Sequence, residues 1–252
     1  MSRNFELMQQ FGEHSEAAST PKPSVILSKA PEEVCTNGAH FGLAQIAHEE
    51  TLRLVQRIFL QQKEKPPHAV LFAGIDHGNG CSQICLSVAE TLASTVKGSV
   101  CLVEANFRSP SLPALLGTTN HYGLVDALMK EGPIRSFAKP VQADNVWLLS
   151  CGSLTADSPN LLNSDHIRAR FEELRKEFDY VLVDAPPLNR YADATALGRL
   201  TDGLVLIVEA HSTRKEATLM VMESLRAAQI PVLGAVLNKR TFPIPESLYH
   251  RL

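Results

Sequence analysis

Residues 69–83 read AVLFAGIDHGNGCSQ, and the architecture of the chain can be predicted outward from this stretch. Its first part, Ala69–Ala73, is an uninterrupted apolar run that predicts a strand buried on both faces. A loop containing Gly78 and Gly80 follows, and a helix is predicted over about residues 82–95. The two glycines allow a tight turn whose N–H groups face an anion at the positive end of the helix. The stretch is therefore a candidate phosphate-binding loop.

The same alternation of strands and helices continues along the chain. Further strands are predicted at Ser99–Val103, Val146–Leu149, Tyr180–Val183, Gly203–Val208 and Val232–Leu237, and helices at residues 45–62, 163–177, 192–200 and 214–228. The strands are continuous apolar runs, which is typical of a parallel sheet covered by helices on both faces. The sequence therefore predicts an α/β protein, a three-layer α/β/α sandwich with a mainly parallel sheet.

The composition is that of an ordinary globular protein. The 252 residues are 44% hydrophobic and 20% charged, with a formal net charge of −3. These values exclude a disordered chain and a strongly basic nucleic-acid-binding protein, so no nucleic-acid partner is expected. No apolar run approaches the roughly 20 residues of a membrane span, and the N-terminus lacks the apolar core of a signal peptide. We expect a cytoplasmic location.

Three parts of the chain differ in character. Residues 1–40 are polar and interrupted by prolines, so a flexible N-terminal arm is predicted. Residues 41–240 carry the α/β domain, and residues 241–252 form a short C-terminal tail. The five cysteines contain no CxxC pair and are expected to be reduced. Cys81 and Cys85 have a helical spacing, but no other ligands lie at a convincing spacing, so no metal site is expected there.

Two further segments follow strands at the edge where parallel sheets bind ligands. One is residues 103–110 (VEANFRSP), and the other is residues 183–187 (VDAPP). Asp184 has the form of a Walker B carboxylate, which holds magnesium through water; a capping or turn aspartate is the other interpretation. In the first loop, a P-loop would continue with lysine and then serine or threonine, whereas this chain has Cys81 and Ser82.

Several segments, in the right order, give a resemblance to a known family. Residues 78–83 (GNGCSQ) resemble the family's Gly-x-Gly-Lys-Ser-Thr loop, and residues 103–112 (VEANFRSPSL) resemble its IDADLRRPSL signature. Residues 121–128 (HYGLVDAL) resemble its GLSDVL stretch, and residues 178–187 (FDYVLVDAPP) resemble FDYVIIDTPP. Residues 193–194 and 237–239 fit two shorter motifs. From about residue 45 to residue 239, the chain is similar to the cytoplasmic domain of bacterial tyrosine kinases of the capsular exopolysaccharide family. These are P-loop NTPase-like proteins related to partitioning ATPases.

The resemblance implies a set of site residues. The nucleotide-binding positions would be Gly78, Gly80, Cys81, Ser82, Gln83, Arg108 and Asn238, of which Asn238 would read adenine. The catalytic positions would be Glu104, Asn106 and Asp184. Ser82 and Asp184 would hold Mg²⁺. His77, Lys97 and Lys239 lie in segments that we expect near this site. Arg108 matches a family arginine, and anion contact and a plain surface guanidinium are both open for it.

The departures from the family pattern predict a degenerate site. Cys81 replaces the P-loop lysine, Gln83 replaces threonine, and Glu104 and Asn106 replace two aspartates. Loss of the lysine removes a charge-assisted bond of about 1.5–3 kcal/mol, which weakens nucleotide binding about 10- to 150-fold. We expect ATP or ADP with Mg²⁺ to bind weakly or not at all, and catalysis is not expected. A helix N-terminus lowers a thiol pKa, so a redox role for Cys81 is one reading, and an inert small side chain is the preferred one.

The resemblance implies a regulatory or scaffold subunit in exopolysaccharide or capsule biosynthesis and export. Its partner would be a membrane polysaccharide co-polymerase or an intact kinase relative, and the helix with Glu50–Arg57 would serve homo-oligomer assembly or simply pack on the core. Whether the chain is an enzyme stays open. The alternative is an active ATP-dependent tyrosine autokinase or ATPase, with Tyr249 as the tail tyrosine. A partitioning-type positioning ATPase ranks last, because the tail is short and only mildly basic.

Overall fold

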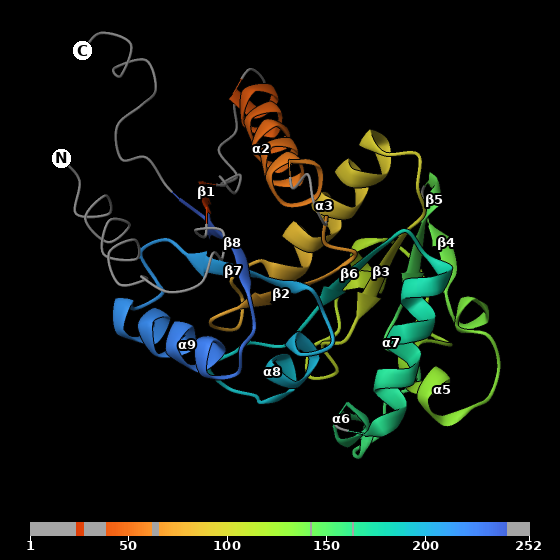
Figure 1. Cartoon of the computed structure of the whole chain (residues 1–252). Coiled ribbons are helices and arrows are strands. Elements are labelled where there is room, and N and C mark those ends of the chain that lie inside the picture. The colour runs from red at the N-terminus through yellow and green to blue at the C-terminus, as the bar shows by residue number, and fades with distance from the viewer. Residues whose placement is uncertain (1–23, 28–38, 62–65, 142, 163, 241–252) are drawn as a thin grey trace, which may run out of the picture.

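The central strand of the sheet is β2 (Ala69–Gly74), the strand with which the predicted phosphate loop begins. The computed structural model describes residues 24–27, 39–61, 66–141, 143–162 and 164–240 (Figure 1). Over these residues, eight strands form one sheet in the order β1-β8-β7-β2-β6-β3-β5-β4. All neighbours are parallel except β4 and β5, which are antiparallel at one edge.

The strands agree closely with those predicted. Besides β2 they are β1 (Ser24–Leu27), β3 (Val100–Glu104), β4 (Lys139–Val141), β5 (Ala143–Leu149), β6 (Tyr180–Asp184), β7 (Gly203–Glu209) and β8 (Val232–Asn238). The helices are α2 (Ala39–Val55), continued by the π-helical turn η1 (Gln56–Leu60), then α3 (Cys81–Thr95), α4 (Leu112–Leu115), α5 (Leu124–Met129), the 3₁₀ turn η2 (Ile134–Phe137), α6 (Ser158–Leu161), α7 (Asp165–Glu177), α8 (Asp193–Gly198) and α9 (Lys215–Ala227). Every predicted strand and helix is present, with ends shifted by a few residues.

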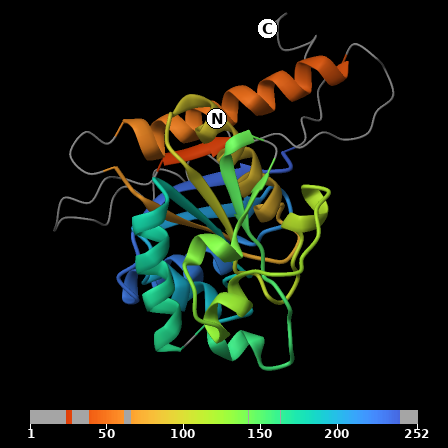
Figure 2. The same cartoon turned by 90° about the vertical axis from the view of Figure 1, so that its right-hand side faces the viewer.

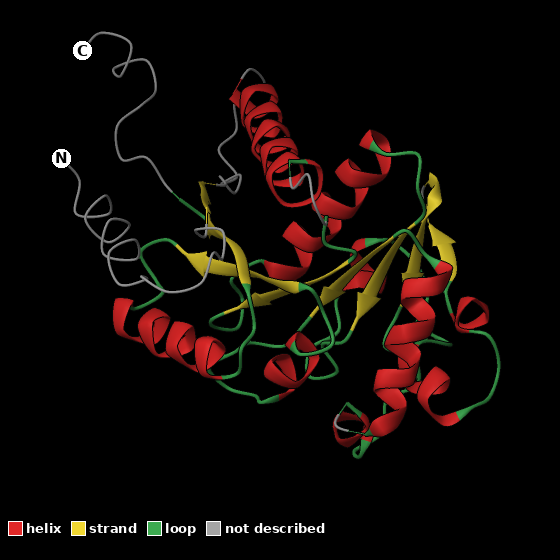
Figure 3. Ribbon diagram, viewed as in Figure 1, coloured by secondary structure: helices red, strands yellow, loops and turns green. Residues whose placement is uncertain are grey.

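Helices cover both faces of the sheet (Figures 1 and 3). On one face, α2, η1 and α3 pack against the sheet through residues that include Val55, Phe59 and Leu92. On the other face, α5, α7, α8 and α9 bury residues such as Phe171 and Leu197. The strands are buried on both sides, which explains their continuous apolar sequence. The predicted three-layer α/β/α sandwich is confirmed.

The predicted arm at residues 1–40 contains an element that we did not expect. Ser24–Leu27 form strand β1, which pairs in parallel with β8 at the edge of the sheet. A four-residue strand with polar flanks has no periodicity that could distinguish it from a loop, so the prediction of an irregular arm was wrong at these positions. Residues 1–23, 28–38 and the C-terminal tail at 241–252, with Tyr249, lie outside the described residues, so the predicted domain limits stay a prediction.

Helix α2 crosses the outside of the sandwich and is seen along its length in Figure 2. Leu54 and Val55 of α2 and Ile58 and Phe59 of η1 are buried against the core. The packing role that we gave this helix as one of two readings is therefore present. None of the helices in the described part of the chain is both long and apolar enough to cross a membrane.

Candidate phosphate-binding site

The loop between β2 and α3 adopts the tight turn that its glycines predict. Gly78 and Gly80 have φ angles of 83° and 81°, in the left-handed region that favours glycine. A Cβ atom on Gly80 would lie 2.4 Å from Nδ2 of Asn238, whereas a Cβ on Gly78 would meet nothing within 4 Å. Gly80 is thus required both by its backbone conformation and by the approach of Asn238.

The N–H groups of this loop have few partners. Within the residues that the structure describes, no hydrogen bond is made by the backbone N–H groups of residues 77–83. These groups precede and open α3, a helix of 15 residues with a positive N-terminal end. Such a set of N–H groups suits an anion with several oxygen atoms, as phosphate has.

Two carbonyl groups of the loop are held by side chains at the end of β8. Asn238 donates from Nδ2 to the Asn79 carbonyl at 2.7 Å, and Lys239 donates from Nζ to the Gly78 carbonyl at 2.6 Å. Lys239 also lies 3.3 Å from a carboxylate oxygen of Glu209. The buried Asn79 side chain accepts a hydrogen bond from the N–H of Asp76 at 2.6 Å. In this structure the Asn238 amide, which the resemblance assigns to adenine, is engaged with the loop backbone.

Ser82 and Asp184 meet as the P-loop and Walker B pattern requires. Ser82 donates from Oγ to Oδ2 of Asp184 at 2.6 Å, and Asp184 is fully buried on β6, between β2 and β3. Its other oxygen, Oδ1, has no hydrogen-bond partner in the described part of the chain. Burial raises the pKa of Asp184 to about 7, and the neighbouring Glu104 charge adds to this, while the Ser82 hydrogen bond opposes it. An unsatisfied buried oxygen beside a serine hydroxyl fits a magnesium-binding pair.

Cys81 occupies the position of the P-loop lysine. It is the first residue of α3, partly buried, and packs against the core beneath α2 and α3. Burial raises the pKa of its thiol well above the ordinary value, and the neighbouring Asp184 carboxyl raises it further. The thiol is therefore neutral near pH 7. The expectation of a lowered pKa at this position was wrong, because burial and the Asp184 carboxyl outweigh the hydrogen bond with the Gly74 backbone that lowers it, and the redox reading loses its basis.

Glu104 has a structural role that its sequence position did not reveal. Its carboxylate is fully buried at the end of β3, opposite Asp184 on β6. Oε1 accepts hydrogen bonds from the N–H groups of Ser111 and Leu112 at 2.6 and 2.7 Å, and Oε2 accepts one from Cys151 at 3.2 Å. Both oxygen atoms are thus used to hold the chain, and the carboxylate stabilises the loop that follows β3.

Asn106 and Arg108 are likewise engaged within the protein. Oδ1 of Asn106 accepts a hydrogen bond from the N–H of Ser109 at 3.2 Å. The Arg108 guanidinium lies 3.4 Å from a carboxylate oxygen of Asp193 and 4.6 Å from the centre of the Tyr191 ring. The Arg108 side chain is 39% exposed, so it can still be reached by an anion, but its charge is already paired.

Of the other side chains predicted near the phosphate-binding site, two lie at the loop and one does not. His77 lies in the loop, with Nε2 3.4 Å from Oγ of Ser109, and Gln83 is exposed on the first turn of α3. Lys97 is exposed between the end of α3 and the start of β3, at the opposite edge of the sheet. The expectation that Lys97 approaches the site was wrong, because α3 runs antiparallel to the strands and carries Lys97 away from the loop.

The site therefore fits Mg²⁺ and nucleotide only in part. Free loop N–H groups, Ser82 and Asp184 suit phosphate and magnesium. The lysine position offers no positive charge, and Arg108 and Lys239 both have carboxylate partners. If a magnesium nucleotide binds, the loop N–H groups, Ser82 and Asp184 would hold it, and the metal would neutralise charge on its phosphates. Sequence reasoning placed Asp193 in a family motif but did not predict its ion pair with Arg108, nor the contacts of Asn79 and Glu104, because side-chain hydrogen bonds leave no periodic signal in the sequence.

Comparison with known proteins identifies the relatives of the chain. No family model matches it. Tyrosine-protein kinase YwqD of Bacillus subtilis is 27% identical over 170 residues, which cover 68% of this chain and 71% of YwqD. The putative tyrosine-protein kinase CapB of Staphylococcus aureus is 24% identical, over 77% of this chain and 84% of CapB. The succinoglycan biosynthesis transport protein ExoP of Rhizobium meliloti is 31% identical over 64% of this chain, which spans only 21% of ExoP.

Solved structures agree with the fold. The kinase domain of the Escherichia coli tyrosine kinase ETK superposes with a TM-score of 0.79 at 18% identity, over 97% of this chain and 98% of that domain. The septum site-determining protein MinD of Pyrococcus horikoshii, solved with Mg-ADP, gives a TM-score of 0.59 at 18% identity, over 73% and 76% of the two chains. The homologues of this chain are thus bacterial tyrosine kinases, and its P-loop NTPase-like α/β fold is that of their kinase domains and of MinD-type ATPases.

Proposed function

We propose that this chain is a kinase-like protein with a degenerate phosphate site that acts as a regulatory or scaffold subunit in exopolysaccharide or capsule biosynthesis and export. The observation that carries the proposal is the neutral Cys81 thiol at the P-loop lysine position. Arg108 and Lys239 are paired with Asp193 and Glu209, so neither stands free as a replacement. Phosphoryl transfer depends on positioning and charge neutralisation, and this site is poor in the second.

The relatives support the pathway. Several are tyrosine-protein kinases, and one is a succinoglycan biosynthesis transport protein. A subunit of such a system would work at the cytoplasmic face of the membrane, held there by its partner. The partner would be a membrane polysaccharide co-polymerase or a relative with an intact phosphate site.

The outer face of α2 and η1 supports a role in assembly. The Arg53 side chain is 62% exposed and pairs with Glu50 at 2.6 Å, and Gln56 and Arg57 are exposed beside it. The opposite face of the same helix is buried in the core, so the helix can present this polar stripe without moving. We assign the stripe of Glu50, Arg53, Gln56 and Arg57 to docking of the partner or of a second copy.

A binding experiment tests the proposal. The full chain is used to capture a co-polymerase and an intact kinase relative, with wild type compared with the double variant Arg53→Glu, Arg57→Glu. Arg226→Glu, an exposed change on α9, serves as the control. We expect capture by wild type and the control and loss of capture by the double variant. If wild type captures neither protein, the scaffold role is contradicted.

One observation favours the alternative of an active enzyme. The Ser82–Asp184 pair is in place, and the loop N–H groups remain available for phosphate. An active ATPase or tyrosine autokinase would turn over ATP with Mg²⁺, lose that turnover in Asp184→Ala, and carry phosphate on Tyr249 or another tyrosine. Absence of both turnover and phosphotyrosine at high protein concentration would remove this alternative.

A further inference from the structure

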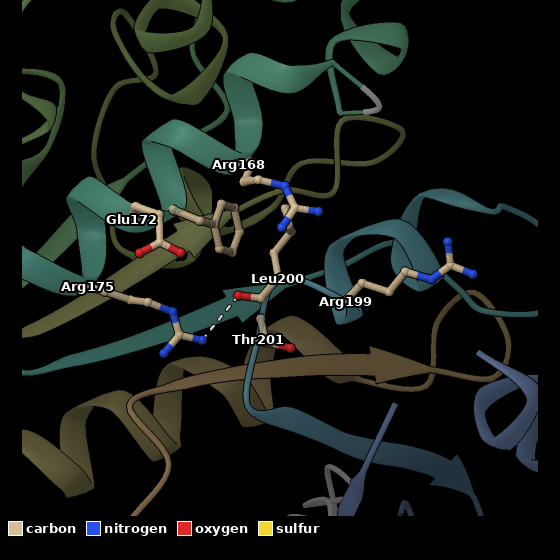
Figure 4. Close-up of a pocket in the computed structure, with 7 residues that line it drawn as sticks. Arg168, Glu172, Arg175, Arg199, Leu200 and Thr201 are labelled. Carbon is tan, nitrogen blue, oxygen red and sulfur yellow. Dashed lines mark hydrogen bonds between the residues drawn. The ribbon is translucent and has the colours of Figure 1, made fainter. Parts of the chain in front are cut away.

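A cavity lies at the edge of the sheet opposite the phosphate loop. It has a volume of about 300 Å³ and lies between α7 and the turn that joins α8 to β7 (Figure 4). Its lining includes Arg168, Phe171, Glu172, Arg175, Arg199 and Thr201. Three arginines around one small cavity are unusual in a chain whose net charge is −3, and neither the site above nor its proposed function uses them.

One of the three arginines builds the wall. Arg175 donates from Nη1 to Oδ2 of Asp202 at 3.0 Å and from Nη2 to the Leu200 carbonyl at 3.1 Å. Asp202 also accepts the N–H groups of His68 and Ala69 at 2.7 and 2.8 Å. Arg175 therefore fixes α7 to the start of β2 and β7 and gives the cavity a rigid side.

The other two arginines have no polar partner among the residues that the structure describes. Arg168 and Arg199 are exposed, and neither makes a hydrogen bond or ion pair with any residue in the described ranges. Figure 4 shows Arg168 directed from α7 toward Leu200, while Arg199 extends from the end of α8 away from the other labelled side chains. Both residues line the cavity, and exposed side chains change rotamer within nanoseconds, so both guanidinium groups can turn toward it. Together they offer ten N–H donors.

We propose that this cavity binds a phosphate monoester. A carboxylate is satisfied by one bidentate arginine, whereas a phosphate dianion has three oxygen atoms and can accept from two guanidinium groups on different elements. The volume exceeds what a bare phosphate ion fills, which leaves room for the organic part of the ester beside the small exposed part of Phe171, whose side chain is otherwise buried in the core. This inference stands on the cavity alone and does not depend on the proposed function.

Glu172 sets the strength of this site. Its carboxylate lines the same cavity and has no ion-pair partner within the part of the chain that is described, so it opposes an incoming dianion. Removing its charge should therefore tighten binding of a phosphate ester. A merely structural role for the two arginines gives no reason for such a gain, which makes Glu172 a sensitive probe.

The test is a titration of the full chain with phenyl phosphate, followed by calorimetry and by NMR of the arginine side chains. Wild type is compared with the double variant Arg168→Gln, Arg199→Gln, with Glu172→Gln, and with the control Arg226→Gln on α9. We expect phenyl phosphate to bind at least ten-fold more weakly to the double variant and several-fold more tightly to Glu172→Gln. The control should bind as wild type does. Because the changed side chains are exposed, all variants are expected to fold.

Three probes separate the sources of the phosphate. Inorganic phosphate tests a free ion, a phosphotyrosine peptide tests a modified protein, and benzoate tests a carboxylate of similar size. Binding of inorganic phosphate alone, with no gain from the ring, would reduce the site to one for a free ion and contradict the ester. Equal binding of benzoate, no binding of phenyl phosphate at millimolar concentration, or full binding by the double variant would each overturn the proposal.

Discussion

The loops that follow β2 and β3 leave the same edge of the sheet, but they treat their polar groups in different ways. The β2 loop, with Gly78 and Gly80, keeps its N–H groups free and has a backbone shaped to receive an anion. The β3 loop, with Glu104 and Asn106, uses its polar side chains to hold its own backbone. The shape of a phosphate cradle can therefore persist where the charges that make it catalytic do not.

This difference follows from what each part of the site depends on. The cradle depends on glycine conformations and on carbonyl contacts from Asn238 and Lys239, none of which requires a ligand. The chemistry depends on unpaired charges, and an unpaired buried charge is costly without a ligand. Glu104 avoids that cost by accepting three N–H groups, which its longer side chain can reach.

The largest effect is expected from removing the anchor of the β3 loop. Glu104→Ala leaves three N–H groups, two of them buried and one partly buried, without their charged acceptor, so we expect the free energy of unfolding to fall by about 3–5 kcal/mol. Urea denaturation measures this, with Glu223→Ala, an exposed change on α9, as the control. A loss below about 1 kcal/mol would show that Glu104 does not hold the loop.

The next effect concerns Asp184 and pH. Its folded pKa of about 7 exceeds the ordinary value of 3.8, so the native state holds a proton that the unfolded state has released. The free energy of unfolding should therefore fall as pH rises from about 4 to about 7 and stay level above, by about 4 kcal/mol in all. Asp184→Asn should lose this dependence while keeping an oxygen for Ser82. An unchanged pH profile in the variant would contradict the assignment to Asp184.

A matched pair of glycine changes tests the β2 loop. Both residues have a positive φ, but only Gly80 also has Asn238 against the position of a Cβ. Gly80→Ala should lower the free energy of unfolding by about 2–3 kcal/mol, and Gly78→Ala by about 1 kcal/mol. Thermal and urea unfolding of the two variants gives the comparison. Equal losses would mean that the Asn238 contact does not constrain the loop.

The smallest effect is expected at Arg108. Because its ion pair with Asp193 is partly exposed, Arg108→Gln should cost less than about 1 kcal/mol of stability. Its charge is already paired, so we also expect nucleotide affinity to change by less than about three-fold. A larger loss of affinity, measured by calorimetry, would assign Arg108 to the anion and favour the other of its two readings.

The parts predicted from sequence are those with a local signal. Long apolar strands such as Gly203–Glu209 and amphipathic helices such as Asp165–Glu177 carry their own periodicity and were found. Short elements without it, including Ser24–Leu27 and Lys139–Val141, were missed. Ser24–Leu27 depends on pairing with β8, far along the chain, whereas Lys139–Val141 pairs with the adjacent strand β5 but has only three residues, one of them proline.

In the candidate site as well, the features with a local sequence signal were predicted and those without one were not. The glycine turn and the Ser82–Asp184 pair follow from motif positions, and the structure brings them together. The state of the Cys81 thiol depends on burial and on a carboxyl about a hundred residues away, since Asp184 is the neighbour that raises its pKa. Contacts of that kind leave no trace in local sequence, which is why the thiol was first expected to have a lowered pKa.

The central claim is tested most directly by measuring nucleotide affinity before and after a lysine charge is restored at position 81. ATP and ADP are titrated by calorimetry, with and without Mg²⁺, into wild type and Cys81→Lys. We predict weak or no binding by wild type and a gain of about 10- to 150-fold in Cys81→Lys, because the cradle is present and lacks one charge. Tight magnesium-dependent binding by wild type, or no gain in the variant, would contradict a degenerate but preformed phosphate site.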